Sequence, residues 1–148
     1  MLGLILSIFI FNLLAYKTNK LLTKQQFAHI WIFTIAFQSL VDVYIDIKYE
    51  GYWYFSENID WISILPLTIL IPPVNIIFLN WYPFNGSLKK KTLYFFYWEI
   101  FMVIYEALAL LPQPWGYFHY GWWNLWYSAI CDPMLLYILL TYYKWFVK

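Results

Sequence analysis

Residues 27–45 read FAHIWIFTIAFQSLVDVYI, an apolar stretch whose only acid is Asp42. At about 1.5 Å per residue, a helix of this length spans roughly the 30 Å hydrocarbon core of a bilayer. Three further stretches have similar length and composition, and a shorter one follows Met1 and contains Asn12. The pattern predicts an all-α integral membrane bundle of five transmembrane helices in a single domain, 1–148. The predicted spans are 2–16, 27–45, 61–79, 92–111 and 126–143.

The overall composition also favours a membrane environment. Of the 148 residues, 64% are hydrophobic and only 11% are charged, whereas about 25% of residues in soluble domains are charged. With a formal net charge of +1, the chain offers no basic surface for a nucleic-acid backbone. The single cysteine, Cys131, excludes an internal disulfide and a cysteine-based zinc site, and we interpret it as a small buried hydrophobe.

The lysines predict the orientation of the spans. They cluster in the first connection, in the third connection and at the C-terminus, whereas the second connection is mainly acidic and the fourth carries no Lys. By the positive-inside rule, this alternation places the N-terminus outside and the C-terminus in the cytoplasm. The basic clusters consist of Lys17, Lys20 and Lys24, then Lys89, Lys90 and Lys91, then Lys144 and Lys148.

A proline pair interrupts the third span. Pro72 and Pro73 have no backbone N–H, so the carbonyls of Thr68 and Ile69 lose their usual helix donors. In a bilayer those carbonyls must find other partners, or face protein or water rather than lipid. We therefore expect the third span to be kinked or locally broken near the middle of the membrane.

Four carboxyl groups lie within the predicted spans, on Asp42, Glu99, Glu106 and Asp132. Ionisable groups in a membrane are costly, and they face the bundle interior or a wet cavity. The topology places Asp42, Glu106 and Asp132 in the outer third of the membrane, and Glu99 together with Asn75 in the inner third. No Lys or Arg lies within a span to pair with these acids.

Three interpretations of these acids remain open. They act as hydrogen-bonding groups between helices, they form a proton or cation pathway from Asp132 and Glu106 to Glu99 and Asn75, or the outer carboxyl groups form a lipid-binding or enzymatic site. The leading functional hypothesis is a small transport or ion-coupling protein that forms a homo-oligomer. We name no catalytic residue, cofactor or metal ligand, because no motif for one occurs in the sequence.

The two external connections are rich in aromatic residues, reading YEGYWYF over 49–55 and WGYFHYGWW over 115–123. Trp and Tyr favour the headgroup layer, so these loops are interpreted as an aromatic belt on the outer leaflet. The alternative is a lid or binding surface, with Glu50, Trp53, His119 and Trp123 as candidate binding residues. An accessory subunit that docks a membrane protein partner through this surface is therefore the competing function.

A scattered set of features from residue 42 onward resembles an uncharacterised family of small multi-pass membrane proteins of Gram-positive spore-forming bacteria. The resemblance covers about two-thirds of the chain, and it implies the architecture and a bacterial cytoplasmic membrane location but no activity. The residues that carry it are Asp42, Glu50-Gly51-Tyr52-Trp53-Tyr54, Pro72-Pro73, Trp81-Tyr82-Pro83, Glu106, Gly116, Trp123-Asn124 and Pro133.

Overall fold

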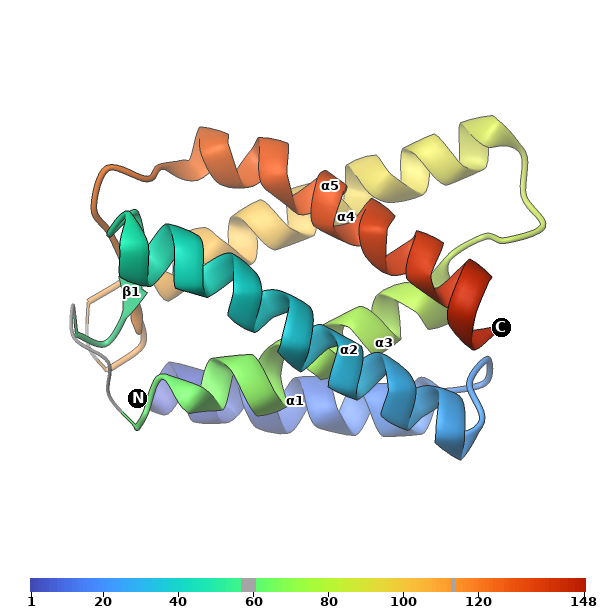
Figure 1. Cartoon of the computed structure of the whole chain (residues 1–148), viewed down its shortest axis with the longest axis horizontal. Coiled ribbons are helices and arrows are strands. Elements are labelled where there is room, and N and C mark those ends of the chain that lie inside the picture. Colours follow the sequence, from blue (N-terminus) through green and yellow to red (C-terminus); the bar gives the residue numbers. More distant parts are fainter. Residues whose placement is uncertain (57–60, 113) are drawn as a thin grey trace.

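The computed structural model describes residues 1–56, 61–112 and 114–148, and it consists mainly of five α-helices (Figure 1). The α-helices are α1 (Leu2–Thr18), α2 (Lys24–Asp42), α3 (Ile71–Trp81), α4 (Leu88–Ala109) and α5 (Leu125–Tyr142). Short π-helical segments continue α2 over Val43–Lys48, precede α3 over Pro66–Leu70 and continue α5 over Tyr143–Val147. The prediction of an all-α fold is confirmed at this level.

The helices run up and down between two ends of the molecule. The N-terminus and both aromatic connections lie at one end, and the C-terminus and the two short connections lie at the other (Figure 1). Three helical segments of the described chain are long and apolar enough to cross a membrane, while the other two are shorter apolar helices. The three are Lys24–Lys48, Leu88–Ala109 and Leu125–Val147, and the shorter two are Leu2–Thr18 and Pro66–Trp81.

Most helices begin and end within a few residues of the predicted span boundaries. The largest difference is in the third span, which was predicted as 61–79, whereas its main helix is assigned over Pro66–Trp81. Pro66 stands at the N-terminal position of that helix, where a missing N–H removes no helical hydrogen bond. Elsewhere, polar caps define the starts: Thr23 forms a capping box with Gln26, and the Asn124 side chain accepts from the first turn of α5.

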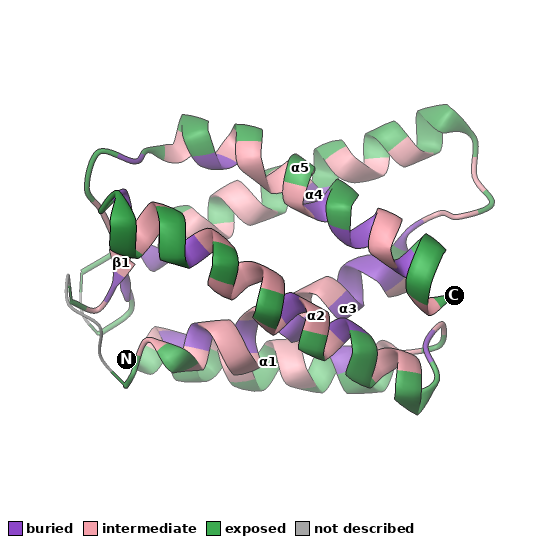
Figure 2. Ribbon diagram, in the orientation of Figure 1, coloured by how far each residue is buried: buried purple, intermediate pink, exposed green. Residues whose placement is uncertain are grey.

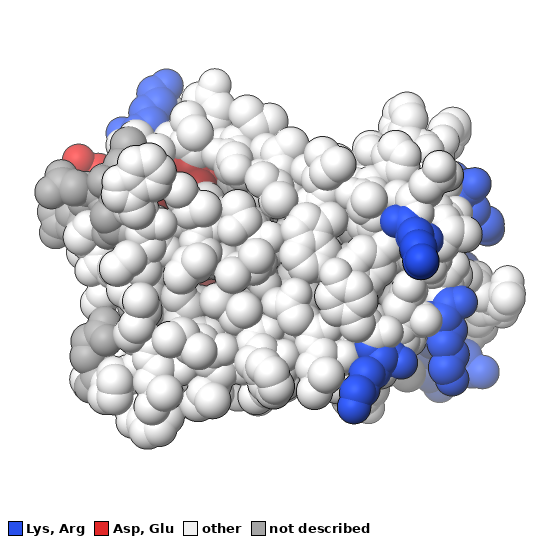
Figure 3. All heavy atoms as spheres, turned by 90° about the horizontal axis from the view of Figure 1, so that it is seen from below, with Lys and Arg blue, Asp and Glu red and all other residues white. Residues whose placement is uncertain are grey.

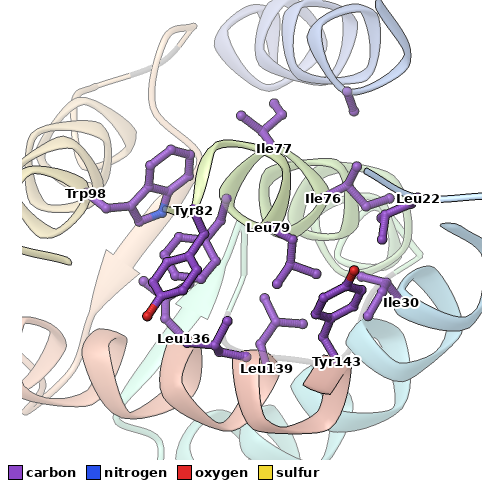
Figure 4. Packing of buried hydrophobic residues seen from close by; sticks show 13 residues of the cluster. Leu22, Ile30, Ile76, Ile77, Leu79, Tyr82, Trp98, Leu136, Leu139 and Tyr143 are labelled. Carbon is purple, nitrogen blue, oxygen red and sulfur yellow. The ribbon is translucent and has the colours of Figure 1, made fainter. Parts of the chain in front are cut away.

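Helix α3 lies at the centre of the packing. It contacts α1 and α2 along its length and approaches α5, while α4 packs mainly against α5. In the larger of two hydrophobic clusters, Leu136 and Leu139 of α5 lie next to Leu79 of α3 (Figure 4). The smaller cluster lies at the end that holds the aromatic connections, and it includes Leu4 of α1.

The outer faces of the helices are apolar as well as the inner ones. Large side chains such as Phe9 and Ile32 are each 67% exposed, and Ile130 is 64% exposed, while most buried residues lie toward the bundle interior (Figure 2). In water such continuous apolar faces are unfavourable, whereas helices that are apolar on all sides are typical of membrane spans. The exposed surface is therefore of the kind that suits a lipid environment.

The charged residues are segregated between the two ends. Every Lys except Lys48 belongs to the end that holds the C-terminus, because the basic clusters lie at the end of α1, the starts of α2 and α4, and the C-terminal tail. Figure 3 shows these lysines gathered at one end of the molecule. The structure thus brings the alternate basic connections together, as the positive-inside pattern requires.

The Thr68 and Ile69 carbonyls, which lose their helix donors because of the proline pair, accept hydrogen bonds from side chains instead. The Asn12 side chain of α1 donates to the Ile69 carbonyl at 2.8 Å, and the Trp31 indole of α2 donates to the Thr68 carbonyl at 3.0 Å. The chain around them changes from π-helix over Pro66–Leu70 to α-helix from Ile71 onward. The π-helical segment that precedes α3 is therefore joined to α1 and α2 through side-chain hydrogen bonds.

We expect Asn12→Leu to lower the free energy of unfolding by about 1 kcal/mol, because the Ile69 carbonyl loses a partly buried donor. The measurement is SDS-induced unfolding of the purified protein in mixed micelles. Thr18→Val is the matched control, because the Thr18 hydroxyl only donates to the Leu14 carbonyl of its own helix. Equal effects of the two variants would show that the Asn12–Ile69 contact adds nothing specific.

Candidate functional site

A cavity of about 190 Å³ lies between the helices, next to the two short strands. Its polar wall includes Gln38 from α2, Asn75 from α3, Glu106 from α4 and Asp132 from α5, so four helices contribute to it. The rest of the wall is mainly apolar and aromatic. The cavity brings together three of the five residues that the sequence suggested for a polar network, namely Asn75, Glu106 and Asp132.

Glu106 is held by hydrogen bonds from two other parts of the chain. Its Oε1 accepts from the Ser128 hydroxyl of α5 at 2.7 Å and from the Tyr120 hydroxyl of β2 at 2.7 Å. The Trp123 indole in turn donates to the Ser128 oxygen at 2.7 Å. This chain of donors fixes the orientation of the Glu106 carboxyl and ties α4 to α5.

Asp132 differs from Glu106 in having no hydrogen-bond partner within residues 1–56, 61–112 and 114–148. It lines the cavity from α5, one helical turn after Ser128. A carboxyl group in such a place must bind water, a proton or a cation, because a bare carboxylate in an apolar wall is very unfavourable. Asp132 is therefore the unsatisfied acceptor of the cavity.

Asp42 occupies a separate place at the end of α2. Its Oδ1 accepts from the Tyr52 hydroxyl at 2.5 Å and from the Gln38 amide at 3.2 Å, and its Oδ2 is buried with no partner in the described part of the chain. Asp42 does not line the cavity, although Tyr52 and Gln38 do. The expected grouping of three outer carboxyl groups is therefore reduced to Glu106 and Asp132, with Asp42 behind Tyr52.

Glu99 and Asn75, which were expected at the same depth, form no hydrogen bond with each other within the described chain. The Asn75 amide donates to the Thr34 hydroxyl at 3.0 Å and faces the cavity. Both carboxyl oxygens of Glu99 are buried, and neither has a hydrogen-bond partner among the residues that the structure describes.

The two aromatic connections form a small antiparallel sheet, β1 (Tyr52–Tyr54) with β2 (Phe118–Tyr120). Tyr52 is the register partner of Tyr120, so both side chains emerge on the same face of the sheet. The Tyr52 hydroxyl binds Asp42 of α2, and the Tyr120 hydroxyl binds Glu106 of α4. We call this arrangement the tyrosine bridge: two paired tyrosines that connect the sheet to carboxyl groups on two helices.

Tyr52 and Tyr120 of the sheet keep their hydroxyl protons because their pKa values are raised. Burial raises the pKa of Tyr52, and the neighbouring Asp42 raises it further. Burial likewise raises the pKa of Tyr120, and its hydrogen bond to Glu106 acts in the same direction. Both hydroxyls therefore remain available to donate to their carboxyl groups well above neutral pH.

The candidate outer-loop residues fall into two groups. Trp53 and His119 are cross-strand partners whose rings stack at 6.1 Å, on the face of the sheet opposite Tyr52 and Tyr120. Glu50 is exposed in the turn before β1 and has a left-handed backbone, with φ of 52°. Trp123, by contrast, is buried and lines the cavity, so it belongs to the candidate site.

Sequence reasoning missed several residues of the site. Gln38 lies four residues before Asp42, to which it donates, so the helical spacing was a usable signal for Gln38. Ser128 had no such signal, because it donates to Glu106 of another helix. Tyr52 and Tyr120 had no local signal, because their roles depend on the pairing of strands that are far apart in the sequence. No group of three His, Cys, Asp or Glu side chains within the described residues could hold a metal ion, and we assign no metal site.

The chain matches no protein family, no curated protein and no solved structure.

Proposed function

We propose that the protein is a five-span protein of a bacterial cytoplasmic membrane that couples a cation to protons through the cavity beside Glu106 and Asp132. The N-terminus would lie outside and the C-terminus in the cytoplasm. The segregation of the lysines to one end supports this orientation, and the apolar outer helix faces support insertion. The two shorter helices would cross the bilayer together with the three longer ones, since all five connect the same two ends.

The observation that carries the proposal is the Asp132 carboxyl. It faces a cavity together with Glu106, on two neighbouring helices, and the described wall of that cavity contains no basic residue. An acid that served only to tie helices together would be hydrogen-bonded to another helix, as Glu106 is to Ser128. The lack of such a bond at Asp132 favours a site for an exchangeable proton or cation.

We expect purified protein in liposomes to carry protons or a monovalent cation under an imposed gradient, and we expect Asp132→Asn and Glu106→Gln to abolish this flux. The readouts are a trapped pH-sensitive dye and a trapped potassium-sensitive dye. Glu50→Gln is the control, because it neutralises an exposed carboxyl outside the cavity. Absence of flux from the unmodified protein, or equal flux from all three variants, would contradict the proposal.

The alternative functions have less support. The hypothesis that a partner docks on the aromatic connections has less support, because several of their aromatic side chains are buried within the molecule: Tyr52, Tyr54, Tyr117 and Trp123. A lipid-acting enzyme would need the three outer carboxyl groups to converge, whereas Asp42 lies outside the cavity wall. A cavity of this size within a 148-residue chain leaves little room for a full pathway, so we retain the expectation of a homo-oligomer.

A further inference from the structure

We propose that the cavity binds a compact organic cation, with its ammonium group on Asp132 and its apolar body against the aromatic wall. The inference names the class of ligand for the same cavity, so it rests on the proposed function for its site. It does not require that the ligand be moved across the membrane. Three properties of the cavity lead to it: its volume, its charge and the chemistry of its wall.

The volume is the first property. The cavity measures about 190 Å³, and an engineered apolar protein cavity of about 150 Å³ is known to bind benzene. A ring with one short substituent is therefore close to the upper limit of size. A proton needs no cavity at all, and a bare metal ion would leave most of this volume empty.

The charge of the wall is the second property. Its described residues include two carboxyl groups, Glu106 and Asp132, and no Lys or His. Two basic side chains of the connections that carry the strands have contacts of their own: the Lys48 amine lies 5.1 Å from the Tyr49 ring centre, and His119 stacks on Trp53. A positively charged ligand is the partner that would complement this wall.

Asp132 is the better anchor of the two acids. Glu106 already accepts two hydrogen bonds on Oε1, from Ser128 and Tyr120. Asp132 has no such donors within the described parts of the chain, and it lines the same cavity. An ammonium group would supply the missing donors at Asp132, and Glu106 would act as the second, pre-oriented negative group.

The apolar wall is the third property, and it separates an organic cation from a hydrated metal ion. Hard cations such as Ca²⁺ need about six to eight oxygen ligands. The wall offers two carboxyl groups and two amides among mainly apolar side chains, and Oε1 of Glu106 already accepts two hydrogen bonds. The wall instead presents the aromatic residues Tyr54, Phe118 and Trp123. Such rings favour both an apolar body and a positive group next to their faces.

The experiment compares two probes of nearly the same shape, benzylamine and benzyl alcohol, at pH 7 in detergent. Benzylamine is a cation at this pH, and benzyl alcohol is neutral. Binding is measured by isothermal titration calorimetry, and each variant is first melted without ligand to establish that it is folded. The proteins are the unmodified chain, Asp132→Asn and the control Glu50→Gln, which removes an exposed carboxyl.

We expect benzylamine to bind the unmodified protein and Glu50→Gln equally, and to bind Asp132→Asn about ten- to a hundredfold more weakly, as expected for loss of a charge-assisted hydrogen bond. Benzyl alcohol should bind weakly to all three. Equal binding of both probes, or unchanged benzylamine affinity in Asp132→Asn, would overturn the proposal. So would failure of the folded, unmodified protein to bind benzylamine.

A second variant keeps the test valid if Asp132→Asn does not fold. Leu135→Phe enlarges a side chain of the cavity wall while retaining both carboxyl groups. It should weaken benzylamine binding at least tenfold, and unchanged binding would overturn the proposal. The liposome experiment is independent: benzylamine binding without any flux would leave this inference standing and reject the transport proposal, and proton flux without benzylamine binding would do the reverse.

Discussion

We expect Gly116→Ala to be the most destabilising single substitution considered, lowering the free energy of unfolding by about 3 kcal/mol. Gly116 is buried in the connection between α4 and β2. A Cβ atom at this position would overlap the backbone carbonyl groups of Leu111 and Ala109. Backbone atoms have no alternative rotamer, so the connection itself would have to move, and the Tyr117–Ala109 hydrogen bond lies within it.

The measurement for Gly116→Ala is thermal unfolding in detergent, followed by circular dichroism. The control is Gly86→Ala, in the turn between α3 and α4, where the nearest neighbours of an added Cβ are atoms of Pro83 at 3.2 Å and the Lys90 Cβ at 3.3 Å. We expect a much smaller change there. Melting of Gly116→Ala within one degree of the unmodified protein would show that the connection adapts freely.

The second large effect is expected for Tyr52→Phe, with a loss of about 2 kcal/mol in the free energy of unfolding. The substitution removes the 2.5 Å hydrogen bond to Asp42 Oδ1 and leaves only the longer one from Gln38. Because Asp42 is buried and its Oδ2 already has no partner in the described chain, the carboxyl group would be left poorly satisfied. Tyr120→Phe should cost less, since Glu106 keeps the hydrogen bond from Ser128.

A double-mutant cycle separates the hydrogen bond from the packing of the ring. In an Asp42→Leu background, Tyr52→Phe should cost less than half of what it costs in the unmodified protein. SDS-induced unfolding in mixed micelles provides the four free energies. Equal costs in both backgrounds would mean that the Tyr52 hydroxyl contributes nothing through Asp42, and the tyrosine bridge would lose one of its two connections.

The helices could be predicted from the sequence because helix formation depends on residues that are close together in the chain. The apolar stretches predicted helices, and the missing N–H groups of Pro72 and Pro73 identified two carbonyls in need of donors. The sequence did not reveal which side chains would supply them. Asn12 and Trp31 are contributed by two different helices, so their roles follow from tertiary packing.

The strands were not predicted, and their absence from the prediction has a physical cause. Each strand has only three residues, and β1 pairs with a partner more than sixty residues later in the chain. Local preference alone is too weak to define such short strands, because strand stability depends on the neighbouring strand. The aromatic residues were therefore interpreted as a belt at the lipid headgroups, whereas half of the sheet faces the cavity.

Part of the candidate site could also be predicted from the sequence. Acids within apolar stretches are rare enough to identify Glu106 and Asp132 from the sequence alone. The sequence could not show that Glu106 is hydrogen-bonded and that Asp132, within the described chain, is not. That difference depends on tertiary structure, because Ser128 and Tyr120 both donate to Glu106. The predicted topology, partners and family resemblance stay predictions.

The tyrosine bridge has a consequence for the register of the sheet. Side chains alternate between the faces of a strand, so a slip of one residue between β1 and β2 would turn one tyrosine away from its carboxyl group while the other kept its place. In such a mismatched register the sheet would keep at most one of its two hydrogen bonds to the helices, Tyr52 to Asp42 of α2 or Tyr120 to Glu106 of α4. The register of this short sheet is thus fixed from outside it, by carboxyl groups on two different helices.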